Sequence, residues 1–173
     1  MNKTKTNTKT ITVTALFAII IAVCSWISFP IASVPMTLQT FAVALTGYVL
    51  GYKRGTVCTL IYLIMGAIGI PVFSSFRGGF QVLLSPSGGF LFGFLALAFL
   101  CGLNTKSTRA SILLGLLGLV ICHILGIAQL SVVTSVSPVA AFLSASLPFI
   151  LKDAVSIILA RFIALRIGRE ITL

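Results

Sequence analysis

Acidic side chains are scarce in this sequence, whose 173 residues include only two of them against twelve lysines and arginines. Charged residues make up 8% of the chain and hydrophobic residues 58%. Because a soluble domain usually carries about a quarter charged residues, this composition excludes an ordinary soluble protein. The length fits one domain, and the mean hydropathy of +1.19 indicates that this domain lies in a membrane.

Residues typical of catalytic and metal sites are also few. The chain has one histidine, His123, and four cysteines that lie in apolar stretches without a C-x-x-C pair. We expect the cysteines to be small buried apolar side chains and no metal to be bound, since one histidine beside one cysteine does not make a metal site. There is no nucleophile–base set and no second carboxylate for acid–base catalysis, so the sequence predicts no enzyme.

Asp153 is the only carboxylate side chain in the first 169 residues, and it follows Lys152 directly inside the apolar run 146–160. The other acid, Glu170, is three residues from the end of the sequence, where a charge meets water easily. A charge buried in hydrocarbon is costly, so it persists mainly when it is paired or used. We interpret Asp153 as a functional residue; the alternative is a structural ion pair that holds one helix in a bundle.

The local geometry around Asp153 suggests two further points. Neighbouring side chains on a helix point about 100° apart, so we expect Lys152 and Asp153 to pair poorly with each other and to interact with other helices. Pro148 lies five residues before Asp153 and is predicted to disrupt the helix there.

Six apolar stretches are long enough, or nearly long enough, to cross a hydrocarbon core, which takes roughly 20 residues per helix. They cover residues 11–30, 36–52, 55–71, 87–104, 110–134 and 139–167. The first follows three lysines and resembles a signal peptide, but no small-x-small cleavage site follows it, so we expect it to be retained. The sequence thus predicts an all-α integral membrane protein with six transmembrane helices.

The positions of the basic residues predict the orientation of these helices. With six spans, ten of the twelve cations fall on one side of the membrane, which the positive-inside rule makes cytoplasmic. They are Lys3, Lys5, Lys9, Lys53, Arg54, Lys106, Arg109, Arg161, Arg166 and Arg169. We therefore predict cytoplasmic tails at residues 1–10 and 169–173 around a transmembrane domain at 11–168, with both termini cytoplasmic. Anionic lipid headgroups are the expected partner of this charge.

Topology leaves Lys152 and Arg77 unexplained, and Arg77 lies in an outer segment, residues 71–90, that is too aromatic for a plain surface loop. Paired glycines there allow close backbone approach, and Ser87 precedes the fourth span, whose N-terminus suits an anion. The aromatic and glycine residues are Phe73, Phe76, Phe80, Phe90, Gly78, Gly79, Gly88 and Gly89. This combination suits a small amphipathic carboxylic acid; the alternative is a tight re-entrant loop that needs glycine only for its turns.

Small residues mark one face of the first span. Ala15, Ala18 and Ala22 lie along it, and the last two form a small-xxx-small pair. Small residues let helices approach closely in lipid, so this face is a candidate site for docking another membrane protein.

Several strings of residues resemble one known family. They are VPMTLQT at 34–40, RG at 54–55, YLIMGAIGIPVF at 62–73, RGG at 77–79 and PSGGF at 86–90. Together they resemble BioY, the biotin-binding S components of energy-coupling factor (ECF) transporters, over roughly residues 12–168. The resemblance implies six membrane helices with a substrate pocket near the outer face. It also implies that biotin is bound as substrate and that no cofactor is needed.

The resemblance further implies partners: one transmembrane coupling protein and two ATP-hydrolysing subunits. The chain lacks the phosphate-loop motif G-x-x-x-x-G-K-[ST], so ATP chemistry would belong to those subunits. The family's docking face on the first helix matches Ala18 and Ala22, with Ala15 beside them. The predicted substrate-binding residues are Asp153, Lys152, Arg77, Gln39, Tyr62, Phe73, Gly79, Gln81, Ser87, Gly88 and Gly89.

Three other functions remain open at this point. The chain could be a stand-alone proton-coupled carrier with Asp153 as the proton site, a structural membrane subunit, or an S component for another vitamin. Biotin's chemistry fits the isolated charges, since its ureido N–H groups suit a carboxylate and its valerate suits a cation. The residues do not decide whether Lys152 or Arg77 is that cation.

Overall fold

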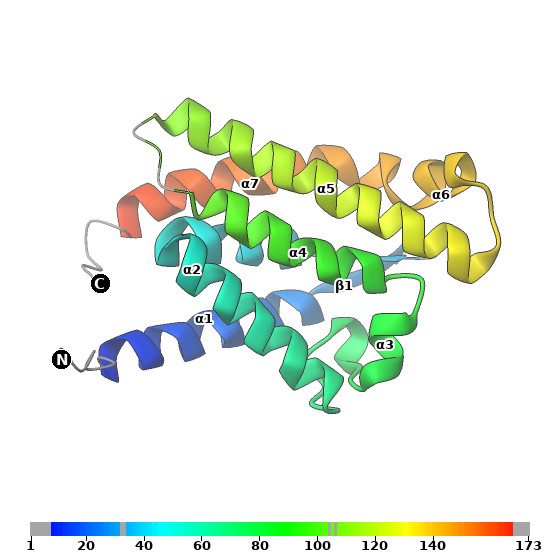
Figure 1. Cartoon of the computed structure of the whole chain (residues 1–173), viewed down its shortest axis with the longest axis horizontal. Coiled ribbons are helices and arrows are strands. Elements are labelled where there is room, and N and C mark those ends of the chain that lie inside the picture. Colours follow the sequence, from blue (N-terminus) through cyan, green and yellow to red (C-terminus); the bar gives the residue numbers. More distant parts are fainter. Residues whose placement is uncertain (1–7, 32–33, 104, 106, 168–173) are drawn as a thin grey trace, which may run out of the picture.

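The chain folds into a bundle of helices with one small β-hairpin (Figure 1). The computed structural model describes residues 8–31, 34–103, 105 and 107–167. The elements are α1 (Thr8–Trp26), β1 (Ser28–Ile31), β2 (Val34–Thr37), α2 (Gln39–Ala67), the 3-10 turn η1 (Ser74–Phe76), α3 (Phe80–Leu84), α4 (Gly88–Cys101), α5 (Thr108–Thr134), α6 (Pro138–Ala145) and α7 (Leu147–Ile167). The predicted tails lie almost entirely outside the described residues. The start of α1 and the end of α7 lie at the same end of the bundle (Figure 1).

The second and third predicted spans form one element, α2, which folds back on itself. Gly51 has φ 78° and ψ 168°, values outside the helical region that glycine adopts easily. A side-chain carbon added to Gly55 would lie 2.9 Å from the Cα of Gly47. Residues eight apart in a straight helix would be about 12 Å apart, so the chain reverses at Gly51. The sequence predicted this break two to three residues later, at Lys53 and Arg54.

The hairpin corrects the expectation of an all-α protein. β1 and β2 pair antiparallel, with Ser28 opposite Thr37 and Pro30 opposite Pro35. Proline at the third position of one strand and the second of the other disfavours a helix through this segment, because proline lacks the donor N–H. We had included residues 28–30 and 36–37 in apolar spans, since their composition is as apolar as that of the neighbouring helices.

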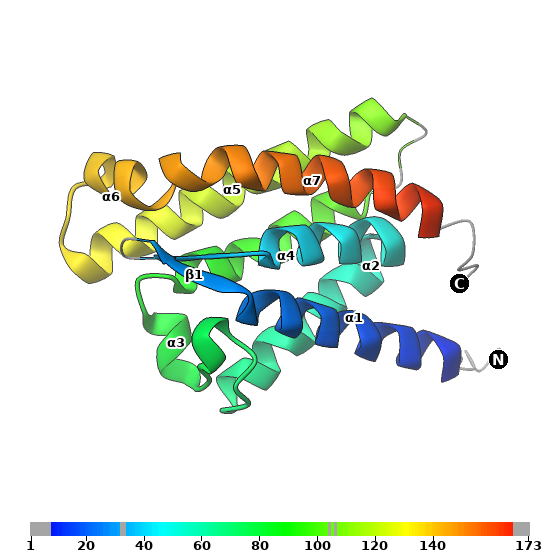
Figure 2. The same ribbon diagram turned by 180° about the vertical axis from the view of Figure 1, so that it is seen from behind.

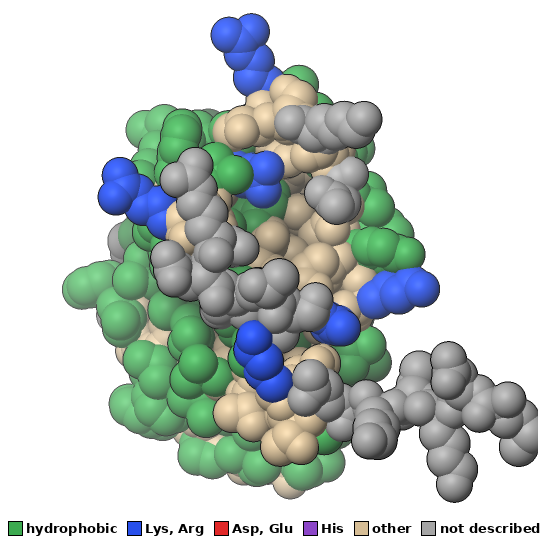
Figure 3. Space-filling view, turned by 90° about the vertical axis from the view of Figure 1, so that its left-hand side faces the viewer, with side chains coloured by type: hydrophobic (Ala, Val, Ile, Leu, Met, Phe, Trp, Pro, Cys, Tyr) green, Lys and Arg blue, Asp and Glu red, His purple; other side chains and the backbone are tan. Residues whose placement is uncertain are grey.

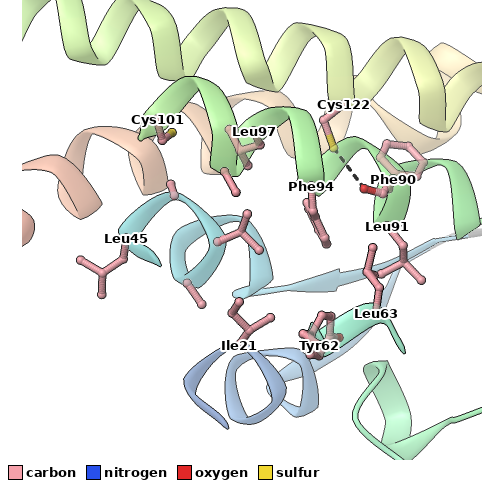
Figure 4. Close-up of a cluster of buried hydrophobic side chains, with 14 of the residues drawn as sticks. Ile21, Leu45, Tyr62, Leu63, Phe90, Leu91, Phe94, Leu97, Cys101 and Cys122 are labelled. Atoms are coloured by element: carbon pink, nitrogen blue, oxygen red, sulfur yellow. Dashed lines mark hydrogen bonds between the residues drawn. The ribbon is translucent and has the colours of Figure 1, made fainter. Parts of the chain in front are cut away.

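The part of the core drawn in Figure 4 lies between α1, α2, α4 and α5. Small residues bring α4 and α5 together closely, since a side-chain carbon added to Gly93 would lie 2.5 Å from the Cα of Cys122. Cys122 Sγ donates to Phe90 O at 3.4 Å. Cys58, Cys101 and Cys122 are buried, as predicted, whereas Cys24 is only half-buried; all four are free thiols.

The last predicted span is broken. α6 and α7 are bent by 54° at Ser146, two residues before Pro148. This confirms the predicted helix disruption near Pro148. The break lies beside α5, where Ser146 contacts His123, so it shapes the site described below.

Helix lengths support fewer membrane spans than predicted. Among the described residues, α1 and α5 are long and apolar enough to cross a membrane, and α6–α7 counts as a third if the bent pair forms one span. α4 is apolar but has only 14 residues. Length and composition do not establish six spans, because α2 reverses midway and α4 is short.

Two of the three alanines of the proposed docking face are turned inward. Ala18 and Ala22 are each 5% exposed and belong to the core, whereas Ala15 is exposed. This corrects the expectation that both face a partner protein. Their small size serves the packing of α1 against α2 in this chain, as small residues allow close helix contact.

Candidate functional site

A small, mostly apolar cavity with several polar side chains lies between the hairpin, α2, α4, α5 and α7. The hairpin lies at the end of the bundle opposite the start of α1 (Figure 2). The cavity has a volume of about 60 Å³. It is lined by Val34, Pro35, Met36, Thr37, Gln39, Thr40, Phe73, Ser74, Val82, Ser87, Phe90, Leu91, Phe94, Leu119, Cys122, His123, Phe149, Lys152 and Asp153. Five predicted residues are therefore brought together here: Asp153, Lys152, Gln39, Phe73 and Ser87.

Asp153 carries the buried charge of this cavity. It lies one turn into α7 beyond Phe149 and is 6% exposed. Its Oδ1 lies 2.5 Å from Lys152 Nζ, and its Oδ2 lies 3.6 Å from His123 Nε2. The pair Lys152–Asp153 thus does form, contrary to the sequence expectation, because the long lysine side chain bends back across the 100° between neighbours.

The Asp153 carboxylate has acceptor capacity beyond its ion pair. Its Oδ1 is inaccessible to water and faces the Lys152 ammonium. An ionised carboxylate offers about four acceptor sites on its two oxygens. The arrangement therefore suits a ligand that brings N–H donors to the carboxylate.

His123 belongs to the site, although the sequence analysis set it aside. It is 7% exposed, and its Nδ1 lies 2.8 Å from the hydroxyl of Ser146, at the α6–α7 break. With Ser146 donating to Nδ1, the hydrogen on Nε2 faces Asp153. The sequence offers one clue to this role, because His123 is the lone histidine and lies in an apolar span. Asp153 is thirty residues away in the sequence, so only the fold brings the two side chains together.

Lys152 also holds the hairpin. Its Nζ donates to Thr37 O at 2.7 Å, at the end of β2. The Lys152 ammonium therefore contacts both the Asp153 carboxylate on α7 and the end of β2, which forms part of the cavity wall. Among the described residues that line the cavity, Lys152 is the only lysine or arginine.

A chain of hydrogen bonds forms another wall. Gln39 Nε2 donates to the Tyr62 hydroxyl at 2.6 Å, and that hydroxyl donates to Val72 O at 3.1 Å. Thr37 Oγ1 donates to Gln39 Oε1 at 3.2 Å. Tyr62 therefore supports Gln39 from behind without lining the cavity. Such satisfied networks fix the orientation of the side chains that do line it.

The remaining predicted residues lie outside the lining. Arg77 is exposed and donates from Nε to Ser74 O at 3.3 Å, so it lies beside a residue that does line the cavity. Gln81 is exposed and bonded to Gly78 O at 3.4 Å. Gly88 and Gly89 pack against Leu83 and α5, as the Cβ positions show. Gly79, with φ 100°, is the residue before α3.

Aromatic rings supply the apolar walls. Phe90 meets His123 edge-on with ring centroids 5.6 Å apart, and Phe73 meets Tyr62 in the same way at 5.6 Å. Gly126 of α5 lies directly behind Phe90, since an added Cβ would be 2.4 Å from its ring. The absence of a side chain at Gly126 therefore sets the position of this wall.

Gly126→Ala is expected to lower the free energy of unfolding by about 1–3 kcal/mol, the usual cost of an extra methyl group in a packed core. The methyl group would displace the Phe90 ring. Thermal unfolding in detergent, followed by circular dichroism, measures the change. The double variant with Phe90→Leu should cost less than the sum of both single changes. Additive costs would contradict the proposed contact.

Comparison with known proteins identifies the family. The sequence model of the BioY family matches residues 1–172. The chain belongs to the BioY family. It is 40% identical over 158 residues to the biotin transporter BioY of Thermotoga maritima, covering 89% of this chain and 92% of that protein. It is also 40% identical over 159 residues to the probable biotin transporter BioY of Pyrococcus horikoshii, covering 92% and 96%.

A solved structure shares the fold of this BioY family member. The crystal structure of the S-component for biotin from an ECF-type ABC transporter superposes with a TM-score of 0.89. The match covers 99% of this chain and 96% of that one, at 27% identity. The fold is therefore that of an S component, and the apolar helices are those of a membrane protein.

Proposed function

We propose that this chain is the biotin-binding S component of an ECF-type vitamin uptake transporter. It is not an enzyme, as expected for a family whose members are named transporters. The observation that carries the proposal is the buried Asp153 carboxylate in the wall of the cavity, between Lys152 and His123. Biotin's ureido ring presents N–H donors, and an ionised carboxylate has acceptor sites beyond the one that Lys152 occupies. A site built around such a bond rejects analogues without the donor.

The lining suggests how the rest of biotin is held. The fused rings lie between Phe90, Phe94 and Phe149, which face the cavity near Asp153. In this proposal the valerate chain runs toward Ser74 and Ser87, which also line the cavity. Arg77 is bonded to Ser74 and is in position to meet the carboxylate there, while Lys152 stays with Asp153 at the ureido end.

Biotin entry requires the cavity to widen. Ligand pockets usually have volumes of about 300–1,000 Å³, far above the 60 Å³ found here. The hairpin residues Val34 to Thr37 form one wall, and Lys152 of α7 donates a hydrogen bond to Thr37 O of that wall. We propose that the hairpin moves outward to admit biotin and that the bond from Lys152 to Thr37 O holds it in the closed position.

The orientation follows from charge. With six membrane passes, counting the two parts of α2 separately and α6–α7 as one, both termini face the cytoplasm by the positive-inside rule. The cavity, at the opposite end from the start of α1, then opens to the outside of a bacterial plasma membrane. Biotin is captured from that side and delivered inward.

Energy for delivery would come from partner subunits. We propose a transmembrane coupling protein and two ATP-hydrolysing subunits, because this chain has no phosphate-loop motif. Biotin is the substrate, and no cofactor is required. Of the predicted docking residues, Ala15 is the exposed one and remains the candidate contact on α1.

Purified protein is expected to bind biotin with a Kd well below about 1 μM, a free energy of more than about 8 kcal/mol. Isothermal titration calorimetry in detergent measures this directly. Trp26 offers a second readout, because the single tryptophan stacks on Phe76 at 5.0 Å, next to Arg77. Micromolar or weaker binding, or equal binding of thiamine, would contradict the assignment.

Uptake by vesicles separates the ATP-driven S component from a stand-alone carrier. Reconstituted chain with its partner subunits should accumulate biotin only when ATP is supplied on the cytoplasmic side. Uptake by the chain alone that collapses with the proton gradient would instead favour the proton-coupled carrier, with the Asp153–His123 pair as the proton site.

A further inference from the structure

A second cavity lies at the opposite end of the bundle from the first and shares no lining residue with it. Its volume is about 300 Å³. It lies between the turn in α2, the end of α4 and α7, and its walls include Tyr48, Gly51, Arg54, Thr105 and Arg161. Biotin binding as proposed above makes no use of it.

Arg161 lines this cavity, and no carboxylate pairs with it among residues 8–31, 34–103, 105 and 107–167. Within the same residues its Nε, which is inaccessible to water, has no hydrogen-bond partner. The guanidinium lies over the Tyr48 ring, 5.4 Å from its centroid, and the Tyr48 hydroxyl is fixed by donating to Ser111 O at 3.1 Å. Asp153, the one acid within the part of the chain that the structure describes, is already paired with Lys152. A buried donor of this kind calls for an acceptor.

Two further features add positive potential. Arg54 supplies a second guanidinium to the lining and is exposed. The reversal at Gly51 makes the second part of α2 begin within the wall of the cavity, so the positive end of that helix dipole lies at this site.

The surroundings are basic as well. Figure 3 looks onto the end of the bundle where α1 starts and α7 ends, and the charged side chains visible among its coloured residues are all lysine or arginine. Under the topology above, this end lies at the inner surface of the membrane, beside anionic headgroups.

We propose that this cavity binds a phosphate group. Guanidinium groups bind phosphate oxygens bidentately, and two of them with a helix N-terminus match a dianion better than a single carboxylate. The phosphate belongs either to a free phosphate compound of the cytoplasm or to the headgroup of an anionic phospholipid. Both sources offer the same oxygens to the guanidinium groups of Arg161 and Arg54.

The test uses the full chain in a neutral detergent. Inorganic phosphate is titrated by calorimetry at constant ionic strength, with chloride as the matched control. In the second arm, native mass spectrometry counts phosphatidylglycerol retained by the protein, with phosphatidylcholine as the control lipid. We expect retention of phosphate, of phosphatidylglycerol, or of both, and which arm responds identifies the source.

Arg161→Gln and Arg54→Gln should each weaken this binding about tenfold or more, since each removes a charge-assisted bond. Arg161→Lys should lie between the wild type and Arg161→Gln, because it keeps the charge but loses the fork of donors. The matched control is Arg166→Gln, which removes one charge from α7 outside the cavity lining. Gel filtration checks that each variant remains monodisperse.

Three results would overturn the proposal. The first is that neither phosphate nor phosphatidylglycerol is retained above its control. The second is that Arg166→Gln weakens binding as much as Arg161→Gln does. The third is that binding is seen only in the Glu170→Gln variant, which would show that the chain's own second acid is the natural occupant. Biotin binding does not depend on this site, so a failure to bind biotin in the earlier titration would leave the phosphate test intact.

Discussion

Asp153→Asn is expected to weaken biotin binding by at least about a hundredfold. The carboxylate is buried between Lys152 Nζ and His123 Nε2. A hydrogen bond from the ureido N–H to a charged acceptor is worth about 1.5–3 kcal/mol, and asparagine removes that charge. The amide also presents N–H donors toward those of the ureido ring, where an acceptor is needed. Calorimetric titration with biotin measures the loss.

The control for this variant is Glu170→Gln, the same chemical change at the chain's other acid. It should bind biotin like the wild type. Asp153→Asn must also remain monodisperse and helical in detergent, which distinguishes loss of the site from loss of the fold. Normal biotin affinity in a folded Asp153→Asn protein would make Asp153 a structural ion-pair residue, the alternative that the sequence left open.

Lys152→Met is expected to weaken biotin binding at least about tenfold and to speed its dissociation. The ammonium joins Asp153 to Thr37 O of the hairpin, so its loss leaves the carboxylate short of a partner and the hairpin untied. A lost charge-assisted hydrogen bond is worth about 1.5–3 kcal/mol. Stopped-flow Trp26 fluorescence separates the rates: faster dissociation with unchanged or faster association indicates that the hairpin controls exit.

The matched control is Lys53→Met, which removes an exposed lysine at the other end of the molecule. The double variant Lys152→Met/Asp153→Asn should bind biotin no worse than Asp153→Asn alone, since residues in one contact are not additive. Additive losses would show that Lys152 acts independently, as a partner of the valerate. An Arg77→Gln variant with wild-type affinity would point to the same conclusion.

Much of the fold could be predicted from the apolar runs and from the proline, glycine and charged residues that separate them. The apolar runs locate α1, α4, α5 and α6–α7, and the predicted breaks at Lys53–Arg54 and Pro148 each fall within a few residues of an observed one. These features are local, because proline and glycine act on the backbone of their own segment. The hairpin at 28–37 escaped prediction since strands this short carry little periodicity of their own.

Five of the predicted substrate-binding residues line one cavity: Asp153, Lys152, Gln39, Phe73 and Ser87. They were predicted from the unusual positions of the charges and from the resemblance to BioY. Arg77 was isolated by the same charge argument but lies beside the lining. Ala15, Ala18 and Ala22 were predicted to form a docking face from their spacing and from the resemblance to BioY. Spacing cannot tell which of two helix faces meets the chain's own core.

The sequence by itself determined a membrane protein with a lone buried acid, because hydrocarbon excludes unpaired charge wherever the chain places it. Only the tertiary structure decided what that acid meets. His123 on α5 is thirty residues from Asp153 in the sequence and contacts it. Thr37 at the end of the hairpin is more than a hundred residues from Lys152 and accepts its hydrogen bond. Contacts between distant segments depend on how helices pack and break, which no local pattern records.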